Sequence, residues 1–135
     1  MSYLAERISI ENFFNTNYTP PAGVDLFFEN IPIPEQNNDP YIVLLVRDGT
    51  AFQGSMGGSV NNLFRNNGFA ICEIRHLIDT GTNAALTIAD DIANVFRAQQ
   101  FDGITMLAPT IDRIGDRNGW YQVNVLTNFR RDVFQ

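Results

Sequence analysis

The alternation of apolar and polar residues near the end of the chain constrains the fold more than any other feature. In the segment GWYQVNVLTNFRRDVF, residues 119–134, apolar side chains recur at odd positions: Tyr121, Val123, Val125 and Phe129. Polar residues lie between them: Gln122, Asn124 and Asn128. Successive side chains of a β-strand point to opposite faces of a sheet. The pattern therefore predicts one long strand, with one face in the core, inside a sheet that must supply its neighbours.

Other apolar segments predict those neighbouring strands. The continuous run YIVLLVRDG, residues 41–49, fits a central strand that is covered on both faces. Further strands are expected at 24–29, 69–78 and 101–111. The proline- and asparagine-rich stretch 30–40 is expected to be a loop.

Two glycine-containing stretches between these strands predict reversals and loops. Asp48-Gly49 is a turn signal, and the residues that follow can run back as a hairpin partner. The stretch GSMGGSVNNLFRNNG, residues 54–68, is dense in glycine and asparagine and predicts a long flexible loop.

Two segments carry the spacing of amphipathic helices. In residues 2–15, apolar side chains recur at three- and four-residue steps: Tyr3, Leu4, Ile8, Ile10, Phe13 and Phe14. In residues 83–98, one stripe is apolar: Ala85, Ile88, Ala89, Ile92, Val95 and Phe96. The order of helix, strands, helix and strands predicts one α+β domain over residues 1–135. Its antiparallel-rich sheet is flanked by the N-terminal helix and the central helix.

Composition excludes several classes of function. The chain has nine basic residues, all of them arginine, against fifteen acidic residues, for a net charge of -6. An acidic chain is not expected to bind nucleic acid through a basic surface, although DNA can pass it without binding. The absence of lysine excludes a Walker A lysine and Schiff-base chemistry. Cys72 and His76 are single, so an internal disulfide and a zinc site are not expected.

The beginning of the chain predicts neither a secretory signal nor a membrane anchor. Glu6, Arg7 and Glu11 interrupt its apolar pattern. No uncharged apolar run approaches the roughly 20 residues that cross a bilayer. We expect no contact with a membrane.

The motif Asp-Thr-Gly at residues 79–81 raises the possibility of an aspartic protease. Such enzymes bring two of these loops together so that two carboxyl groups share a proton, and this chain has one. A turn explains the same residues: Asp79 ends a strand, Gly81 supplies unusual backbone angles, and Thr80 or Thr82 caps the helix. An apolar helical stripe follows where the protease needs a returning strand. An Asp79-dependent hydrolase therefore stands only as an alternative.

Other candidate sites are less specific. His76 with Ser55 or Ser59 could form a triad, but the nucleophile motif Gly-x-Ser-x-Gly is absent. The sequence GSMGGS at residues 54–59 could cradle a phosphate, yet no helix pattern opens directly after it. Asp90 and Asp91 could bind a cation with Asp102, although adjacent acids on a helix are usually a solvated face. We expect no catalytic, cofactor-binding or metal-binding residues.

Three segments together resemble a known family over residues 3–132. They are LLVRDGTAFQGSMGG, then RNNGFAICEIRHLIDTGTNAALTIADDIANVF, and the closing GWYQVNVLTNFRRD. This pattern is similar to the tail terminator, or tail completion, proteins of long-tailed bacteriophages, the minor tail protein U-like family. The RNNG stretch, the Gly-Thr junction into the helix and the late Gly-Trp-Tyr-Gln strand carry the resemblance.

The resemblance implies a structural virion protein without enzymatic activity. Such a protein forms a homo-oligomeric ring, as a rule a hexamer, that caps the finished tail tube and joins the tail to the head. The implied partners are other copies of the chain, the tail tube protein and a head-tail connector or neck protein. DNA passes through the lumen without specific binding. The implied place is the virion, after assembly in the host cytoplasm; another ring of the neck is the alternative.

The ring interface is expected to use the stretch 54–68, which is too long for a plain connection, together with arginines. Arginine pairs bidentately with carboxylates of a neighbour, so Arg65→Glu is expected to shift the protein toward monomer. Successive strand residues face opposite ways, so at most one of Arg130 and Arg131 can pack against the body. The other is expected to contact an axial partner, and alanine at both positions is expected to leave folding intact. The candidate interface residues are Arg47, Phe52, Gln53, Arg65, Asn66, Trp120, Arg130 and Arg131.

Overall fold

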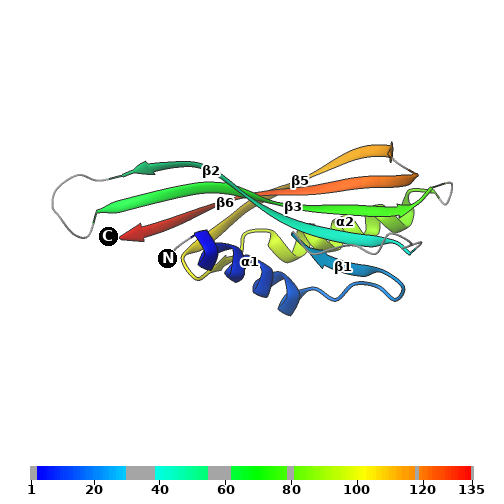
Figure 1. The fold of residues 1–135 in the computed structure, drawn as a ribbon, viewed down its shortest axis with the longest axis horizontal. Helices are drawn as coiled ribbons and strands as arrows, with labels where there is room; N and C mark the ends of the chain where they lie inside the picture. Colours follow the sequence, from blue (N-terminus) through cyan, green and yellow to red (C-terminus); the bar gives the residue numbers. More distant parts are fainter. Residues whose placement is uncertain (1–2, 30–38, 55–61, 79–80, 118, 135) are drawn as a thin grey trace.

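The computed structural model describes residues 3–29, 39–54, 62–78, 81–117 and 119–134. Its elements follow in the order α1 (Tyr3–Asn17), β1 (Asp25–Phe28), β2 (Tyr41–Gln53), β3 (Leu63–Leu77), α2 (Asn83–Phe96), β4 (Gln100–Phe101), β5 (Ile104–Arg117) and β6 (Trp120–Phe134). The six strands form one sheet in the spatial order β1-β2-β3-β6-β5-β4, and both helices lie on the same face of it (Figure 1). The predicted α+β fold with two flanking helices is confirmed.

The sheet is antiparallel except at one edge. β1 pairs in parallel with the first residues of β2, from Asp25 opposite Tyr41 to Phe28 opposite Leu44. β3 lies at the centre and pairs along its whole length with β6, from Leu63 opposite Phe134 to Leu77 opposite Trp120. The long alternating strand predicted at 119–134 is therefore β6, and its inward residues Val123, Val125 and Phe129 are buried.

The core lies between the sheet and the two helices. The predicted apolar stripe of α2 is confirmed, because its alanines, isoleucines and Phe96 are buried and belong to one hydrophobic cluster. α1 differs from prediction. It buries Glu6, Ile10 and Phe14, whereas Leu4 and Ile8 are exposed. The buried positions are four residues apart and form a narrow stripe, so the helix touches the sheet with less of its surface than its apolar residues suggested.

The prediction of a flexible loop over 54–68 is wrong for the described part of that stretch. β3 begins at Leu63 and β2 continues to Gln53, so the RNNG sequence lies inside a strand. Pairing on both sides of β3 explains this, since its residues bond to β2 and to β6 at once. At Gly68 the three strands come close: a Cβ atom there would lie 2.6 Å from the carbonyl oxygen of Arg47 and 2.7 Å from the Phe129 ring.

The hairpin predicted after Asp48-Gly49 is also wrong. β2 passes through this dipeptide with a register shift between Asp48 and Ala51 and continues in the same direction. A bulge accommodates the extra residues without reversing the strand. Conversely, Asp102 and Gly103 do form a tight turn, with φ of 48° and 79°, which joins β4 to β5. β5 then runs to Arg117, beyond the predicted end at residue 111.

The interpretation of the Asp-Thr-Gly motif as a turn is supported at Gly81, the one residue of the motif that the structure describes. Gly81 has a φ of 81°, the left-handed conformation that glycine adopts readily. Thr82 occupies the N-cap position of α2 but makes no side-chain capping bond. Asp79 and Thr80 lie outside the described residues.

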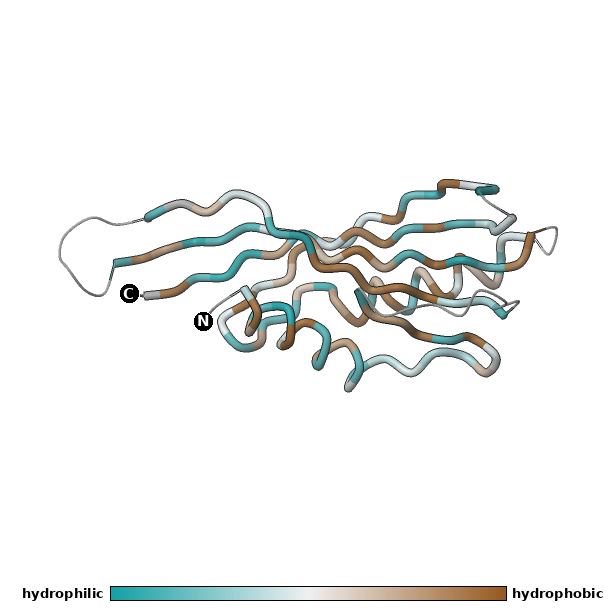
Figure 2. Tube along the Cα trace, in the orientation of Figure 1, coloured by the Kyte–Doolittle hydropathy of each residue, from teal (hydrophilic) through white to brown (hydrophobic). Residues whose placement is uncertain are grey.

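The ends of three strands form an arm, whose base lies against α1 and whose tips extend past the helices. We define the arm as Asp48–Gln53 of β2, Leu63–Gly68 of β3 and Phe129–Phe134 of β6, which pair with one another. In Figure 1 these strand ends project to the left of α1, and in Figure 2 they are hydrophilic along part of their length and hydrophobic toward the tips of β3 and β6. No described helix is long and apolar enough to span a bilayer.

Candidate functional site

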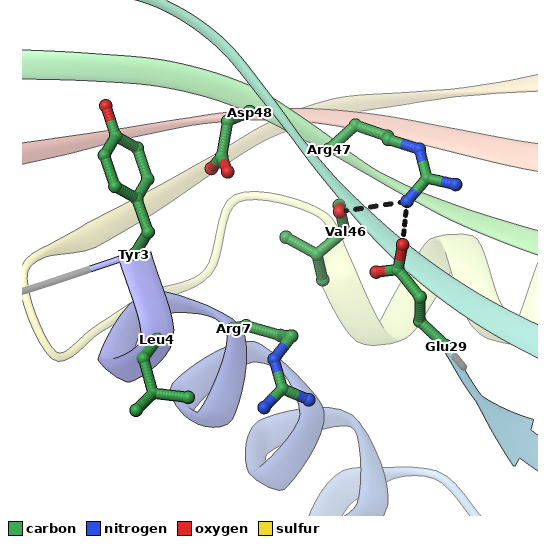
Figure 3. Close-up of a pocket in the computed structure, with 7 residues that line it drawn as sticks. All are labelled: Tyr3, Leu4, Arg7, Glu29, Val46, Arg47 and Asp48. Atoms are coloured by element: carbon green, nitrogen blue, oxygen red, sulfur yellow. Dashed lines mark hydrogen bonds and ion pairs between the residues drawn. The ribbon is translucent and has the colours of Figure 1, made fainter. Parts of the chain in front are cut away.

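A groove of about 410 Å³ lies at the base of the arm, where the start of α1 faces the bulge of β2. Three elements line it: α1, the end of β1 and the middle of β2 (Figure 3). The lining residues are Tyr3, Leu4, Arg7, Glu29, Val46, Arg47 and Asp48.

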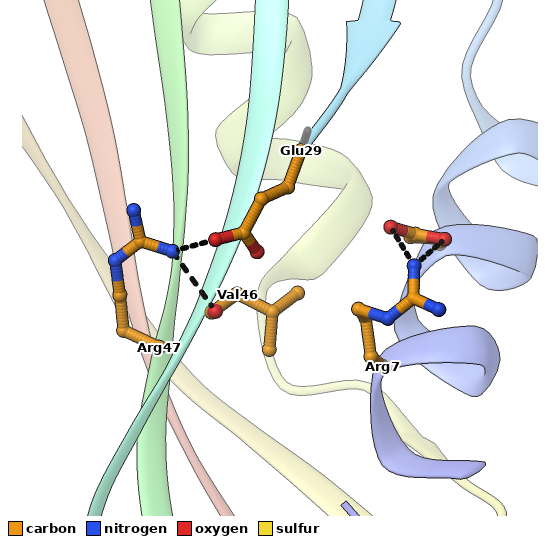
Figure 4. Close-up of polar contacts among 5 residues, drawn as sticks. Arg7, Glu29, Val46 and Arg47 are labelled. Atoms are coloured by element: carbon orange, nitrogen blue, oxygen red, sulfur yellow. Dashed lines mark hydrogen bonds and ion pairs between the residues drawn. The ribbon is translucent and has the colours of Figure 1, made fainter. Parts of the chain in front are cut away.

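Intramolecular ion pairs occupy the arginines of this groove. Arg47 pairs with Glu29 and also donates to the carbonyl oxygen of Val46 at 3.4 Å (Figure 4). Arg7 pairs with Glu11 one helical turn away at 3.1 Å. Arg47, predicted as an interface residue, is thus already paired within the subunit, although its side chain is 45% exposed. The two arginines of the groove are therefore already neutralised by carboxylates of the same chain. A ligand would meet hydrogen-bonding groups there rather than a free cation.

A buried charge cluster lies beside this groove and joins α1 to the arm. The Nε atom of Arg131 donates to Glu6 at 2.6 Å, and the two side chains are only 2% and 1% exposed. The Tyr3 ring stacks over the Arg131 guanidinium at 5.6 Å. Burial is the main cause that raises the pKa of Glu6 to about 7, and a hydrogen bond with Asp48 adds to it, while the charge of Arg131 opposes the rise.

The two successive arginines of β6 face opposite ways, as predicted. Arg131 packs against Glu6, whereas Arg130 lies on the other face of the sheet and is half-buried. The Nε atom of Arg130 is buried without a hydrogen-bond partner among the described residues. This pairing argues against the expectation that alanine at both positions spares folding, because removing Arg131 leaves the Glu6 carboxyl buried without its counter-charge.

The candidate residues of β2 and β3 lie along the arm. Arg65 pairs bidentately with Asp132 of β6, at 2.6 and 2.9 Å. This pairing lowers the pKa of Asp132 and raises that of Arg65. The remaining candidates are placed by register alone: Phe52 opposite Arg65, Gln53 opposite Phe64, and Asn66 between Ala51 and Arg131.

The Arg65–Asp132 pair changes how an Arg65 variant is interpreted. A glutamate at position 65 would face Asp132 and repel it, so it would disturb the arm itself as well as any contact with a neighbour. The expected monomer after Arg65→Glu would therefore not identify an interface contact by itself.

Trp120 lies at the opposite end of the sheet from the other candidates. It begins β6 and packs edge-on against Tyr41, with ring centroids 5.4 Å apart. Tyr41 in turn contacts Phe27 and accepts a hydrogen bond from Arg75 at 2.7 Å. Trp120 thus helps to cover the face of the sheet that carries no helix.

That helix-free face, which we call the open face, carries an apolar row that the sequence analysis did not single out. Leu45, Ile71 and Leu126 lie opposite one another on three adjacent strands. All three are half-buried, and none belongs to the hydrophobic core. The strand alternation could have revealed them, since Ile71 and Leu126 occupy positions predicted to be outward-facing.

The described residues form no catalytic or metal-binding constellation. Asp79, Ser55 and Ser59 lie outside them. The Nδ1 atom of His76 is buried without a described partner. Asp90 and Asp91 are exposed on α2, and no three potential ligands are grouped in the described parts of the chain.

Comparisons with known proteins support the fold. No protein-family model and no curated protein sequence matches this chain. Eleven chains of solved structures match it. One, a protein whose name gives no function, has a TM-score of 0.71 and 12% sequence identity, and the match covers 100% of this chain and 99% of that one. At this identity the likeness shows a shared fold and leaves function to other arguments.

Proposed function

We propose that this protein is a tail terminator of a long-tailed bacteriophage: a structural protein that forms a ring, caps the completed tail tube and joins the tail to the head. The three sequence segments that resemble this family support the proposal. The family resemblance also implies a hexamer, with the tail tube and the neck connector as axial partners and DNA passing through the lumen.

The observation that carries the proposal is the arm. The tips of three strands project beyond the helices (Figure 1), and they carry both polar and apolar residues. A projecting sheet stiffened by the Arg65–Asp132 pair suits contacts with other proteins better than it suits catalysis. The net charge of -6 accords with a channel that DNA traverses without adhering.

Complementation tests this function directly. Purified protein is added to extracts of cells infected with a phage that lacks its terminator, and head-joined tails of normal length are counted by electron microscopy. We expect tails of uniform length joined to heads. Overlong tail tubes and free heads at the level of the untreated extract would contradict the proposal.

Co-purification separates the terminator from another ring of the neck. A terminator is expected to be retained by tail tubes in the absence of heads. Retention by the portal-side connector alone would assign the protein to the neck instead.

A further inference from the structure

The two halves of α1 are held against the rest of the molecule by different kinds of contact. The second half buries Ile10 and Phe14, and the Phe14 ring stacks on that of Phe96 in α2, with centroids 5.3 Å apart. Among residues 3–8, the first two turns of the helix, Glu6 has the one buried side chain. We call this segment the clasp. Its attachment depends on an ionisable group, whereas the rest of the helix is attached by apolar packing.

Glu6 fastens the clasp through a cluster of charged groups at the base of the arm. It accepts a hydrogen bond from the Nε atom of Arg131 at 2.6 Å, and it also hydrogen-bonds Asp48 of β2. Two carboxyl groups can share a hydrogen bond only when one of them carries a proton. With the proton, the remaining carboxylate balances the guanidinium charge. Without it, two carboxylates face one guanidinium, and one negative charge is left over beside a Glu6 side chain that is 1% exposed.

The other charged groups near the cluster are already paired or lie elsewhere. Arg7 of the clasp and Arg47 of β2 are paired with Glu11 and Glu29. Tyr3 lies over the guanidinium of the cluster and contributes an aromatic ring rather than a charge. By strand alternation, three charged residues lie on the other face of the sheet: Arg65, Arg130 and Asp132. Loss of the proton therefore weakens the attachment of the clasp.

The groove of about 410 Å³ adjoins both the clasp and the cluster (Figure 3). Tyr3, Leu4 and Arg7 of the clasp line it, and Asp48 belongs to both the groove and the cluster. Movement of the clasp away from β2 would widen the groove and admit water to Glu6, while the buried residues of the second half of α1 stay in place. The cost in apolar contacts is small, because the large apolar side chains of the clasp are already exposed.

We infer that the clasp is a pH-dependent conformational switch. It lies closed against the base of the arm while Glu6 and Asp48 share a proton, and it opens more often once that proton is lost. Opening exposes Glu6 and Arg131 to water, while the sheet, α2 and the second half of α1 stay folded. The inference goes beyond the proposed function and does not depend on it, since every group in the cluster belongs to one chain.

The direction of the switch follows from the proton affinity of Glu6 in the two states. Burial raises its pKa to about 7 in the closed state, and an opened clasp returns the carboxyl to water and to its ordinary pKa of 4.5. The closed state therefore binds the proton more tightly. Its advantage is complete below about pH 4.5 and is lost as the pH rises through about 7. Between pH 5 and pH 8, the equilibrium constant for opening is expected to rise by a factor on the order of 10–100.

Hydrogen exchange of backbone amides tests the switch. The amides of residues 7–10 donate to the carbonyl groups of residues 3–6 in an α-helix, so opening of the clasp exposes them to exchange. Each measured rate is divided by the intrinsic rate at the same pH, which gives the equilibrium constant for opening. We expect this constant to rise by the stated factor between pH 5 and pH 8. It should depend little on urea below the unfolding transition, because opening of one segment exposes little surface.

Three variants identify the groups responsible. Glu6→Gln should make the opening constant independent of pH, because the amide cannot titrate. Asp48→Asn should reduce the rise, because the ionised Glu6 then has the Arg131 guanidinium to itself. Asp48 is exposed, so this variant is expected to fold. Glu11→Gln is the matched control on the same helix and should keep the full rise.

Several results would overturn the inference. One is an opening constant for residues 7–10 that equals that of the β3 amides in value and in its dependence on urea, since the clasp would then open only when the whole molecule unfolds. Another is a constant that stays the same from pH 5 to pH 8 in the unaltered protein. An undiminished rise with pH in Glu6→Gln or in Asp48→Asn would also overturn it.

Discussion

At the scale of single residues, Glu6 couples stability to pH. Its folded pKa of about 7 lies above the ordinary value of 4.5, so the folded state binds the proton more tightly than the unfolded state. The resulting stabilisation is complete below about pH 4.5 and is lost as the pH rises through about 7. The shift corresponds to at most on the order of 3 kcal/mol.

We therefore predict that the free energy of unfolding falls between pH 5 and pH 8, and that Glu6→Gln reduces this dependence. A neutral amide keeps the shape of the protonated carboxyl and cannot titrate. Urea denaturation at several pH values measures both proteins. An equally steep pH dependence in the variant would show that another group is responsible.

The two neighbouring arginines of β6 are predicted to differ in their effect on stability. At pH 8, where Glu6 is ionised, Arg131→Ala should lower the free energy of unfolding by about 3–5 kcal/mol, because it leaves a buried carboxylate without its partner. Arg130→Ala should change it by no more than about 0.5 kcal/mol, as for other substitutions outside the core. Thermal melts of the two variants measure the two losses of stability. Equal losses would contradict the assignment of the two side chains to opposite faces.

At the scale of elements, the arm depends on close approach of three strands at Gly68. A methyl group there would meet the backbone of Arg47 and the ring of Phe129. We predict that Gly68→Ala lowers the free energy of unfolding by about 1–3 kcal/mol. Gly54→Ala is the matched control, since its nearest neighbour is the movable side chain of Leu63. Equal melting temperatures for the two variants would contradict the packing described.

The elements that local patterns specify were predictable, and those that distant pairing specifies were not. The stripe of α2 and the alternation of β6 appear in the sequence because each residue's environment repeats at a fixed spacing. The strand at residues 63–68 does not appear as a sequence pattern. Its glycine and asparagine residues have low strand propensity, and pairing with β2 and β6 holds them in the strand.

The same distinction applies to the candidate site. Alternation alone predicted that Arg130 and Arg131 face opposite ways. It could not predict that Glu6 is the partner of Arg131, since 125 positions separate the two residues along the chain. A carboxyl inside an apolar helical stripe is the available signal, but the same pattern also fits a solvated residue that interrupts the stripe.

At the scale of the whole molecule, the described helices cover one face of the sheet and leave the other without a helix. Within the described residues, the open face, the exposed side of α1 and the tips of the arm are not covered by another helix. Two-layer domains usually bury their apolar surface internally. Here the row of Leu45, Ile71 and Leu126 on the open face is left half-buried.

The native mass of the purified protein tests the central claim most directly. Native mass spectrometry and electron microscopy of the same sample give the number of subunits and the shape of the particle. The account predicts a closed multiple of the 15.2 kDa chain, with six copies as the resemblance implies, seen as annular particles. A species of 15.2 kDa at every concentration, with no rings on the grid, would contradict it.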